Sequence, residues 1–161
     1  MMIRQVHPED AAAIADIYNY YVQETTVSFE TEPLSVETMH ARILHVVAQY
    51  PFLVWEEEGQ VLGYAYAHQW KERAAYAYTW ESTIYLHPAQ LGRGMGRRLM
   101  QELIPLCRAA GCRGIIACIT QENVASCAFH RALGFTQVSC FPKVGYKLGR
   151  WLDVADFHLA L

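Results

Sequence analysis

Three glycines at alternate positions, Gly92, Gly94 and Gly96, are the part of this sequence with the clearest chemical meaning. The apolar residues that follow them recur at helical spacing, at Leu99, Leu103, Leu106 and Cys107. Glycine lets the backbone approach a ligand closely, and the unpaired amides at a helix N-terminus attract anions. The stretch therefore predicts a pyrophosphate-binding loop that opens a helix.

The spacing of these glycines separates the loop from two common nucleotide sites. It differs from the GxGxxG pattern of dinucleotide-binding folds, and no Gly-Lys-Ser or Gly-Lys-Thr follows, as a phosphate-binding NTPase loop requires. A solvated turn at a helix start is the alternative interpretation, because short glycine motifs also occur by chance. The loop alone thus indicates an anion site without deciding its ligand.

One carboxylate, Glu81, lies a few residues before this loop. The β-branched and aromatic residues that follow it, up to Leu86, predict a strand, and His87-Pro88 ends that strand because proline donates no ladder hydrogen bond. A carboxylate on a strand that leads to an anion site can serve as a general base beside the bound ligand. An exposed strand carboxylate without a catalytic role is the alternative.

The glycine loop resembles the acetyl-coenzyme A loop of the GNAT acetyltransferases, which reads Gln or Arg, two variable residues, Gly, one variable residue, and Gly or Ala. The matching residues here are Leu91, Gly92, Arg93, Gly94, Met95 and Gly96, followed by Arg97. Leu91 replaces the usual Gln or Arg, so one side-chain contact differs while the glycines are intact. The resemblance implies that these amides hold the pyrophosphate of acetyl-CoA. It also implies that pantetheine inserts beside a splayed strand and meets the amides of Ile84, Tyr85 and Leu86, one of which can bind the oxyanion.

The segment from Asn123 to Phe135 resembles the family's Asn-x-x-Ala-x-x-x-Tyr-x-x-x-Gly-Phe segment. In that family segment, Asn and Ser contact the cofactor and Tyr acts as an acid, so the resemblance assigns cofactor contacts to Asn123 and Ser126. His130 occupies the Tyr place. An imidazole can donate a proton near neutral pH, so we expect His130 to protonate the leaving thiolate, with a structural role as the alternative.

Five further stretches narrow the resemblance to the phosphinothricin and methionine sulfoximine N-acetyltransferases. They are Thr25–Pro33, Trp70–Tyr76, Thr79–Tyr85, His130 and Gly145–Val154. The resemblance implies that Glu81 and His130 are the catalytic pair. It also implies that the protein is a homodimer. It also implies that the substrate is the α-amine of a small amino-acid analogue with a tetrahedral, oxygen-bearing side chain.

Acetylating an amine requires its neutral form, and free α-amino groups titrate at about 7.7 to 8.0, so a base is needed near neutral pH. Glu81 is the expected base, acting directly or through a water. The substrate's carboxylate and side-chain oxygens favour nearby cations, and aromatic side chains such as Trp80 can wall its methylene part. The expected substrate-binding residues are Phe29, Lys71, Arg73, Tyr76, Ser82 and Thr83.

The elements that must position these residues follow a strand, two helices, three strands, a helix, a strand, a helix and two strands. The strands are expected at residues 2–6, 52–55, 61–67, 81–86, 113–119, 135–142 and 151–161. Ser35 is the expected cap of the second helix, and the fourth helix is expected at 122–133. This order is that of the α/β GNAT fold, one domain over residues 1–161, with a mixed, mostly antiparallel sheet of about seven strands, helices on both faces and a splay between strands 4 and 5. Pro105, inside the third helix, predicts a kink or an early end.

Composition and charge exclude several classes of protein. The 161 residues carry a formal net charge of −3, which argues against a nucleic-acid binder, and no apolar run is long enough for a membrane span. The early charges of the N-terminal segment differ from a secretory signal, so we expect a cytoplasmic protein. The five cysteines are odd in number and lack CxxC spacing. We expect small buried residues rather than disulfides or zinc ligands.

Two other functions stay open beside an acetyl-CoA-dependent N-acetyltransferase of amino-acid analogues. One is a GNAT enzyme acting on a peptide amine or a polyamine, although a polyamine would prefer an acidic pocket and Lys71 and Arg73 oppose it. The other is a non-catalytic acetyl-CoA sensor, which has no need of both Glu81 and His130.

Overall fold

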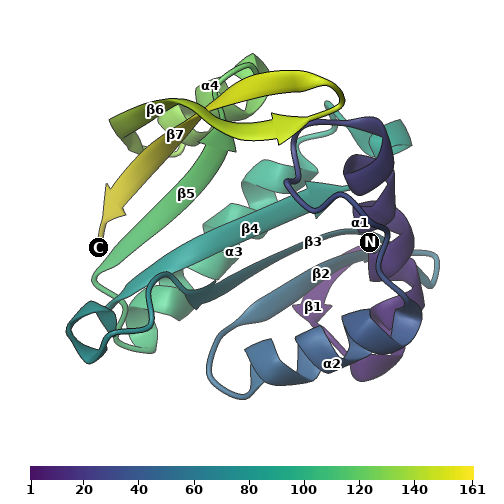
Figure 1. Ribbon diagram of the computed structural model, residues 1–161. Helices are drawn as coiled ribbons and strands as arrows, with labels where there is room; N and C mark the ends of the chain where they lie inside the picture. The colour runs from purple at the N-terminus through teal and green to yellow at the C-terminus, as the bar shows by residue number, and fades with distance from the viewer.

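A seven-stranded sheet runs through the molecule in the order β1-β2-β3-β4-β5-β7-β6 (Figure 1). The computed structural model describes residues 1–161. All neighbouring strands pair antiparallel except β4 and β5, which are parallel. The strands are β1 (Met2–Gln5), β2 (Phe52–Glu57), β3 (Gln60–Gln69), β4 (Thr79–Leu86), β5 (Gly114–Thr120), β6 (Thr136–Lys147) and β7 (Arg150–Ala160). The predicted order and the mixed, mostly antiparallel sheet are confirmed.

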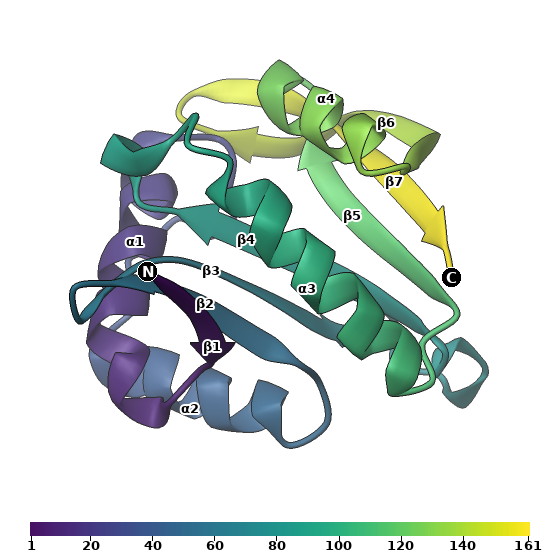
Figure 2. The same ribbon diagram turned by 180° about the vertical axis from the view of Figure 1, so that it is seen from behind.

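Helices cover both faces of this sheet, as predicted. Helices α1 and α2 lie on the face seen in Figure 1, and α3 and α4 lie on the opposite face (Figure 2). The α-helices are α1 (Ala11–Glu24), α2 (Val36–Val47), α3 (Met95–Ala109) and α4 (Val124–Ala132). Short 3-10 helices occupy Pro8–Asp10, Ala74–Tyr76 and Pro88–Gln90. The predicted cap of α2 is confirmed, because the side chain of Ser35 accepts a hydrogen bond from the amide of Thr38.

Alternation along the central strands builds one apolar core on each face. In β2, Leu53 and Trp55 face α3, whereas Phe52 and Val54 face α1 and α2. A strand buried on both faces reads as a continuous apolar run, which explains why this segment was recognisable in the sequence. The two cores fix β2, β3 and β4 between helical layers and so hold the middle of the sheet rigid.

The parallel strands β4 and β5 separate soon after they meet. They pair at Thr79 with Gly114, Trp80 with Ile115 and Glu81 with Ile116, and no further. Beyond these pairs β5 continues along β7, and the strands form the V seen in Figure 1. The predicted splay is thereby confirmed. Glu81 is the last residue of β4 that pairs with β5, at the point where the V opens.

Two β-hairpins extend further than predicted. Strands β2 and β3 were expected at 52–55 and 61–67, but they continue until only Glu58 and Gly59, both with positive φ, join them. Glu57 therefore lies in β2, where it pairs with Arg93. Strand β6 continues past Pro142 to Lys147, because a proline is tolerated on an edge strand where a register shift interrupts the ladder.

Pro105 does not end the third helix. Helix α3 continues through it to Ala109, so the early end that the proline predicted is wrong. Pro105 and Gln101, whose carbonyl loses its helical donor, both lie on the exposed side of α3. Water can satisfy that carbonyl, which limits the cost of the proline.

The cysteines are all free, and they differ in exposure. Cys107, Cys112 and Cys127 are buried as expected, but the expectation of burial was wrong for Cys118 and Cys140, which are exposed. Cys118 is the single exposed residue within β5. Its side chain points into the space that the separation of β4 and β5 creates.

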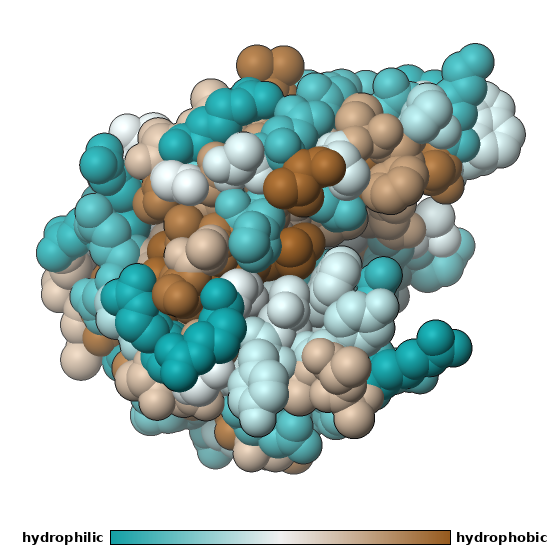
Figure 3. Space-filling view, turned by 90° about the vertical axis from the view of Figure 1, so that its left-hand side faces the viewer, coloured by the Kyte–Doolittle hydropathy of each residue, from teal (hydrophilic) through white to brown (hydrophobic).

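The surface alternates between polar and apolar side chains. Figure 3 shows apolar side chains in separate patches among polar ones, and a notch between an upper and a lower lobe at the right of the view. None of the helices combines the length and the apolar character that crossing a membrane demands.

Candidate active site

A cleft of about 150 Å³ occupies the opening between β4 and β5, and we call it the β4–β5 cleft. It is lined by residues of both strands, of α4 and of the preceding loops. Eight residues that the sequence singled out meet there: Glu81, Ser82, Thr83, Ile84, Tyr85, Asn123, Ser126 and His130. The separation of two parallel strands has therefore brought together residues far apart in the sequence.

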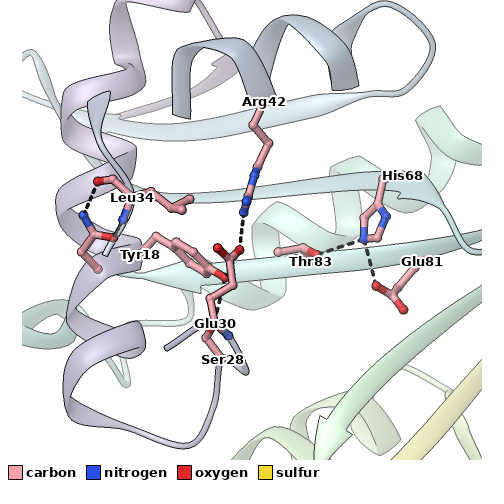
Figure 4. Close-up of polar contacts among 9 residues, drawn as sticks. Tyr18, Ser28, Glu30, Leu34, Arg42, His68, Glu81 and Thr83 are labelled. Atoms are coloured by element: carbon pink, nitrogen blue, oxygen red, sulfur yellow. Dashed lines mark hydrogen bonds and ion pairs between the residues drawn. The ribbon is translucent and has the colours of Figure 1, made fainter. Parts of the chain in front are cut away.

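Glu81 stands at the closed end of this cleft. It is the last residue of β4 that pairs with β5, and its side chain is 27% exposed, so the carboxylate is accessible while its backbone is held on both sides. Nε2 of His68, directly across the β3–β4 pair, lies 2.9 Å from Oε2 of Glu81 (Figure 4). A base needs access to its substrate and a fixed position, and this carboxylate has both.

The glycine loop presents unpaired backbone amides at the start of α3. Gly94 caps the helix with φ of 77°, and none of the amides from Gly92 to Arg97 donates a hydrogen bond within the chain. A Cβ added to Gly92 or Gly94 would meet nothing within 4 Å, so the space beside both glycines is open. Free amides and the positive end of the helix dipole make this loop an anion site.

Two side chains of the loop are engaged within the protein. Nη2 of Arg93 donates to both carboxylate oxygens of Glu57, at 3.0 and 3.1 Å, and its Nη1 donates to Gln90. Met95 is buried against the core, while Leu91 and Arg97 are exposed. The loop is therefore tied to β2 through Arg93, and its backbone amides and the exposed Arg97 are the groups free to meet a ligand.

Helix α4 supplies the opposite wall of the cleft. Oδ1 of Asn123 accepts a hydrogen bond of 3.2 Å from the amide of Ser126 and so caps the helix. His130 is only 3% exposed, and its Nδ1 lies 2.8 Å from the carbonyl oxygen of Ser126. Since a carbonyl can only accept, Nδ1 carries the hydrogen in this contact, and Nε2 of the neutral ring carries a lone pair. Burial lowers the pKa of His130, which keeps it neutral near pH 7.

The hydroxyl of Ser82 is the one buried side-chain polar atom of the molecule without a hydrogen-bond partner. It lines the cleft, where a buried polar group without a partner is costly unless a ligand or water satisfies it. Together with the unpaired edges of β4 and β5 and the amides of the glycine loop, it makes the cleft fit a long ligand with amide groups along its length and an anionic end. Pantetheine ending in a pyrophosphate has this form.

A larger cavity of about 500 Å³ is lined by His68, the residue that contacts Glu81, and we call it the His68 cavity. It is lined by residues of α2, β3 and the following loop, among them Arg42, His68 and Lys71. Nζ of Lys71 lies 4.5 Å from the ring centre of Trp70 and 5.4 Å from that of Tyr76, which holds the ammonium by cation–π contacts. Of the predicted substrate-binding residues, Lys71 is the one in this cavity.

Two predicted substrate residues, Ser82 and Thr83, lie in the β4–β5 cleft beside Glu81, and the other three lie apart from it. Arg73 and Tyr76 line an adjoining cavity of about 420 Å³ together with Trp80, whose indole is buried in the core beneath α3. Phe29 is 45% exposed and packs over Gly145 of β6. The fold thus brings both catalytic candidates and part of the cofactor candidates into one cleft, and it spreads the substrate candidates over four places.

Three polar residues near this site were missed in the sequence. His68 contacts Glu81, and Nη1 of Arg42 donates at 2.7 Å to Glu30, which also accepts from the hydroxyl of Tyr18 (Figure 4). None belongs to a motif. The alternation of Tyr64, Tyr66 and His68 could have placed His68 on one face of a strand, but its pairing partner depends on a strand register that the sequence does not give.

The family described as "Acetyltransferase (GNAT) domain" matches residues 3–155 of this chain. A match over this length, on a fold with the splayed fourth and fifth strands, assigns the protein to that class. The chain belongs to the GNAT acetyltransferase family, and the predicted resemblance is confirmed.

Individual relatives sharpen this assignment. The chain is 40% identical to a phosphinothricin N-acetyltransferase of Alcaligenes faecalis, over 94% of this chain and 78% of the relative. It is 39% identical to an L-methionine sulfoximine/L-methionine sulfone acetyltransferase of Salmonella typhimurium, over 100% of this chain and 95% of the relative. An acetyltransferase structure from Salmonella typhimurium, solved with its cofactor acetyl-CoA, superposes with a TM-score of 0.97 at 38% identity, over 100% of this chain and 94% of that one. These relatives agree with the predicted enzyme class and cofactor.

Proposed function

We propose that this protein transfers an acetyl group from acetyl-CoA to the α-amine of a small amino-acid analogue of the phosphinothricin, methionine sulfoximine or methionine sulfone type. The observation that carries the proposal is the position of Glu81 at the closed end of the β4–β5 cleft, between that cleft and the His68 cavity. A donor in the cleft and an amine in the cavity would meet at this carboxylate. The substrate class comes from the relatives, whose names give these acceptors.

The residues present fit acetyl-CoA. The amides from Gly92 to Arg97 would hold its pyrophosphate, and the unpaired edge of β4 from Ser82 onward would face its pantetheine. When bound, acetyl-CoA supplies the activated acetyl group. The protein contributes the placement of that group and a water-poor cleft around it.

Glu81 serves as the general base in this proposal. It accepts a proton from the substrate ammonium, directly or through a water, and so exposes the lone pair that attacks. His130 was expected to act as an acid, but its neutral state leaves Nε2 as an acceptor. We therefore propose that Nε2 of His130 accepts the second proton that the amine loses on acetylation. His130 can afterwards donate this proton to the departing thiolate.

Direct attack by the amine is supported by the state of Cys118, the cysteine that lines the cleft. Although Cys118 is exposed toward the cleft, the surrounding walls remove part of the water from its thiol, and together with the carboxylates of Glu81 and Asp156 this raises the pKa of the thiol to about 12. A thiol in this state provides very little thiolate at neutral pH, so it is a poor nucleophile for an acetyl-enzyme intermediate.

The charge of the His68 cavity suits an amino-acid substrate. Lys71 and Arg42 supply cations on two of its sides, and the carboxylate of such a substrate would bind to the ammonium of Lys71, which has no carboxylate partner. Arg42 is already paired with Glu30. A polyamine has no carboxylate to satisfy Lys71, which favours the amino-acid acceptor.

The β6–β7 hairpin supports the expected homodimer. Six of its large apolar residues are 50% or more exposed, namely Val138, Phe141, Val144, Tyr146, Leu148 and Trp151. A monomeric protein seldom exposes so many on one element, and a second copy of the chain would cover them. Sedimentation equilibrium of the protein and of a Trp151→Glu variant tests this, because the variant should shift a dimer toward monomer.

A substrate panel tests the function. Thiol release from acetyl-CoA should be fast with phosphinothricin, methionine sulfoximine or methionine sulfone, and slow with spermidine or a peptide N-terminus. Faster turnover of spermidine or the peptide would contradict the substrate class. Tight binding of acetyl-CoA without turnover of any amine would instead identify a non-catalytic sensor.

A further inference from the structure

The imidazole of His68 is held so that one of its nitrogens faces Glu81. Nδ1 lies 3.0 Å from the carbonyl oxygen of Gln69, and that carbonyl can only accept, so Nδ1 carries a hydrogen. Nε2 is thereby turned to the Glu81 carboxylate at 2.9 Å, with the hydroxyl of Thr83 at 3.5 Å (Figure 4). A contact of 2.9 Å between this nitrogen and a carboxylate oxygen needs one hydrogen between them. A proton that Glu81 accepts therefore lies on the line to Nε2 and can pass between the two atoms without any movement of the backbone.

This contact also joins the two cavities of the site. Glu81 lines the β4–β5 cleft and His68 lines the His68 cavity, and their side chains are 27% and 31% exposed. One nitrogen of the His68 ring thus contacts Glu81, and another edge of the ring faces a cavity that is open to solvent. The ring connects the end of the cleft at Glu81 to water.

The reaction requires such an exit for a proton. An ammonium has three hydrogens on nitrogen and the amide product has one, so two protons leave the nitrogen as the new N–C bond forms and the C–S bond breaks. One proton ends on the thiol. The other must reach water before Glu81 can serve as a base again.

We propose that His68 positions Glu81 and relays its proton: Nε2 takes the proton from Glu81, and the hydrogen of Nδ1, whose contact with Gln69 is exposed, leaves to water in the His68 cavity. Exchange of hydrogens with water then restores the starting tautomer of the ring. The inference rests on the proposed function, since it takes Glu81 to be the general base. It adds a residue that acts through Glu81 rather than on the substrate.

The charges around His68 are compatible with a transient imidazolium. Across the cavity stand Arg42 and His45 of α2, with Glu30 from the loop before it, while Lys71 and Glu72 follow β3. The ring of Tyr66 lies 5.6 Å from that of His68, at an interplanar angle of 46°. Arg42 is neutralised by Glu30 at 2.7 Å. Among the ionised groups, Glu81 contacts the ring directly, with its Oε2 2.9 Å from Nε2.

His68→Ala and His40→Ala form a matched pair, because each removes one imidazole and His40, exposed on α2, lies outside the cavity. With both substrates saturating, we expect His68→Ala to lower kcat by about 10-fold near neutral pH. Added imidazole should restore kcat in a saturable way, and a series of substituted imidazoles should restore it according to their pKa. His40→Ala should keep the wild-type kcat and should not respond to imidazole.

The same variants can overturn the proposal. A wild-type kcat and pH–rate profile in His68→Ala would remove the relay, and a loss of kcat that no imidazole restores would reduce His68 to a packing role. His68→Gln, a polar side chain without a titratable proton, covers the case in which the alanine variant fails to fold, and it should show the same loss of kcat. Glu81→Gln distinguishes a failure of the proposed function from a failure of the relay. Full activity of Glu81→Gln would refute Glu81 as the general base. An inactive Glu81→Gln together with a fully active His68→Ala would refute only the relay through His68.

Discussion

The proposed cofactor site and the proposed substrate site near Glu81 are formed by different groups of the protein. The glycine loop before α3 offers mainly backbone amides, and its Arg93 is paired with Glu57, whereas the His68 cavity offers charged and aromatic side chains from α2, β3 and the loop after β3. A backbone site depends on conformation and tolerates many side chains. A side-chain site depends on which residues the fold brings together. The two sites should therefore respond differently to substitution.

Glu81 lies where these two sites meet, and its loss should give the largest effect. Glu81→Gln keeps the size of the side chain but removes the proton acceptor, so kcat should fall by about 100-fold or more while the affinity for acetyl-CoA stays near its wild-type value. Steady-state kinetics and calorimetric titration of acetyl-CoA measure the two quantities. Unaltered turnover would refute the base assignment.

The glycine loop can be tested through its backbone conformation. Gly94→Val places a β-branched residue at φ of 77°, which costs about 1 to 3 kcal/mol and displaces the amides. Since about 1.4 kcal/mol is tenfold in affinity, we expect KM for acetyl-CoA to rise by about 10-fold with a smaller change in kcat.

Gly149→Val is the matched control for that variant. Gly149 has a similar φ of 75° and open space around it, but it lies in the β6–β7 turn and not in the loop. Both variants should lose thermal stability, and only Gly94→Val should raise KM for acetyl-CoA. A comparable rise in both would show that strain, and not the loop amides, determines the affinity.

The proposed substrate site in the His68 cavity is tested at Lys71. Lys71→Met removes the ammonium and keeps most of the aliphatic stem, so KM for the amino-acid substrate should rise by about 5-fold to 10-fold while KM for acetyl-CoA stays constant. Initial rates with each substrate varied in turn separate the two constants. An unchanged KM for the amino acid would place its carboxylate elsewhere, with Arg73 in the adjoining cavity as the next residue to substitute.

The smallest expected effect concerns stability and His130. Burial lowers its pKa in the folded protein below the value near 6.5 that it has when unfolded. On acidification through that window the unfolded chain binds the proton first, so the free energy of unfolding falls. His130→Gln lacks this contribution, and its free energy of unfolding in urea should fall less than that of the wild type between pH 7.5 and 5.5. An equal fall in both would contradict the lowered pKa.

The same contrast explains what the sequence could predict. The glycine loop, the order of the elements and the N-cap at Ser35 are local features, and local residue chemistry was enough to find them. The contact between His68 and Glu81 joins strands separated by a nine-residue loop, and its register follows from packing on two cores. For the same reason the substrate candidates Phe29 and Arg73 could be named from motifs but not placed beside Glu81.

The structure of a dead-end complex with CoA and methionine sulfoximine tests the central claim most directly. We predict the CoA sulfur in the β4–β5 cleft and the substrate α-amine within about 2.6 to 3.2 Å of the Glu81 carboxylate, or joined to it by one water. A sulfur bound outside the cleft, or an amine directed away from Glu81, would contradict the account.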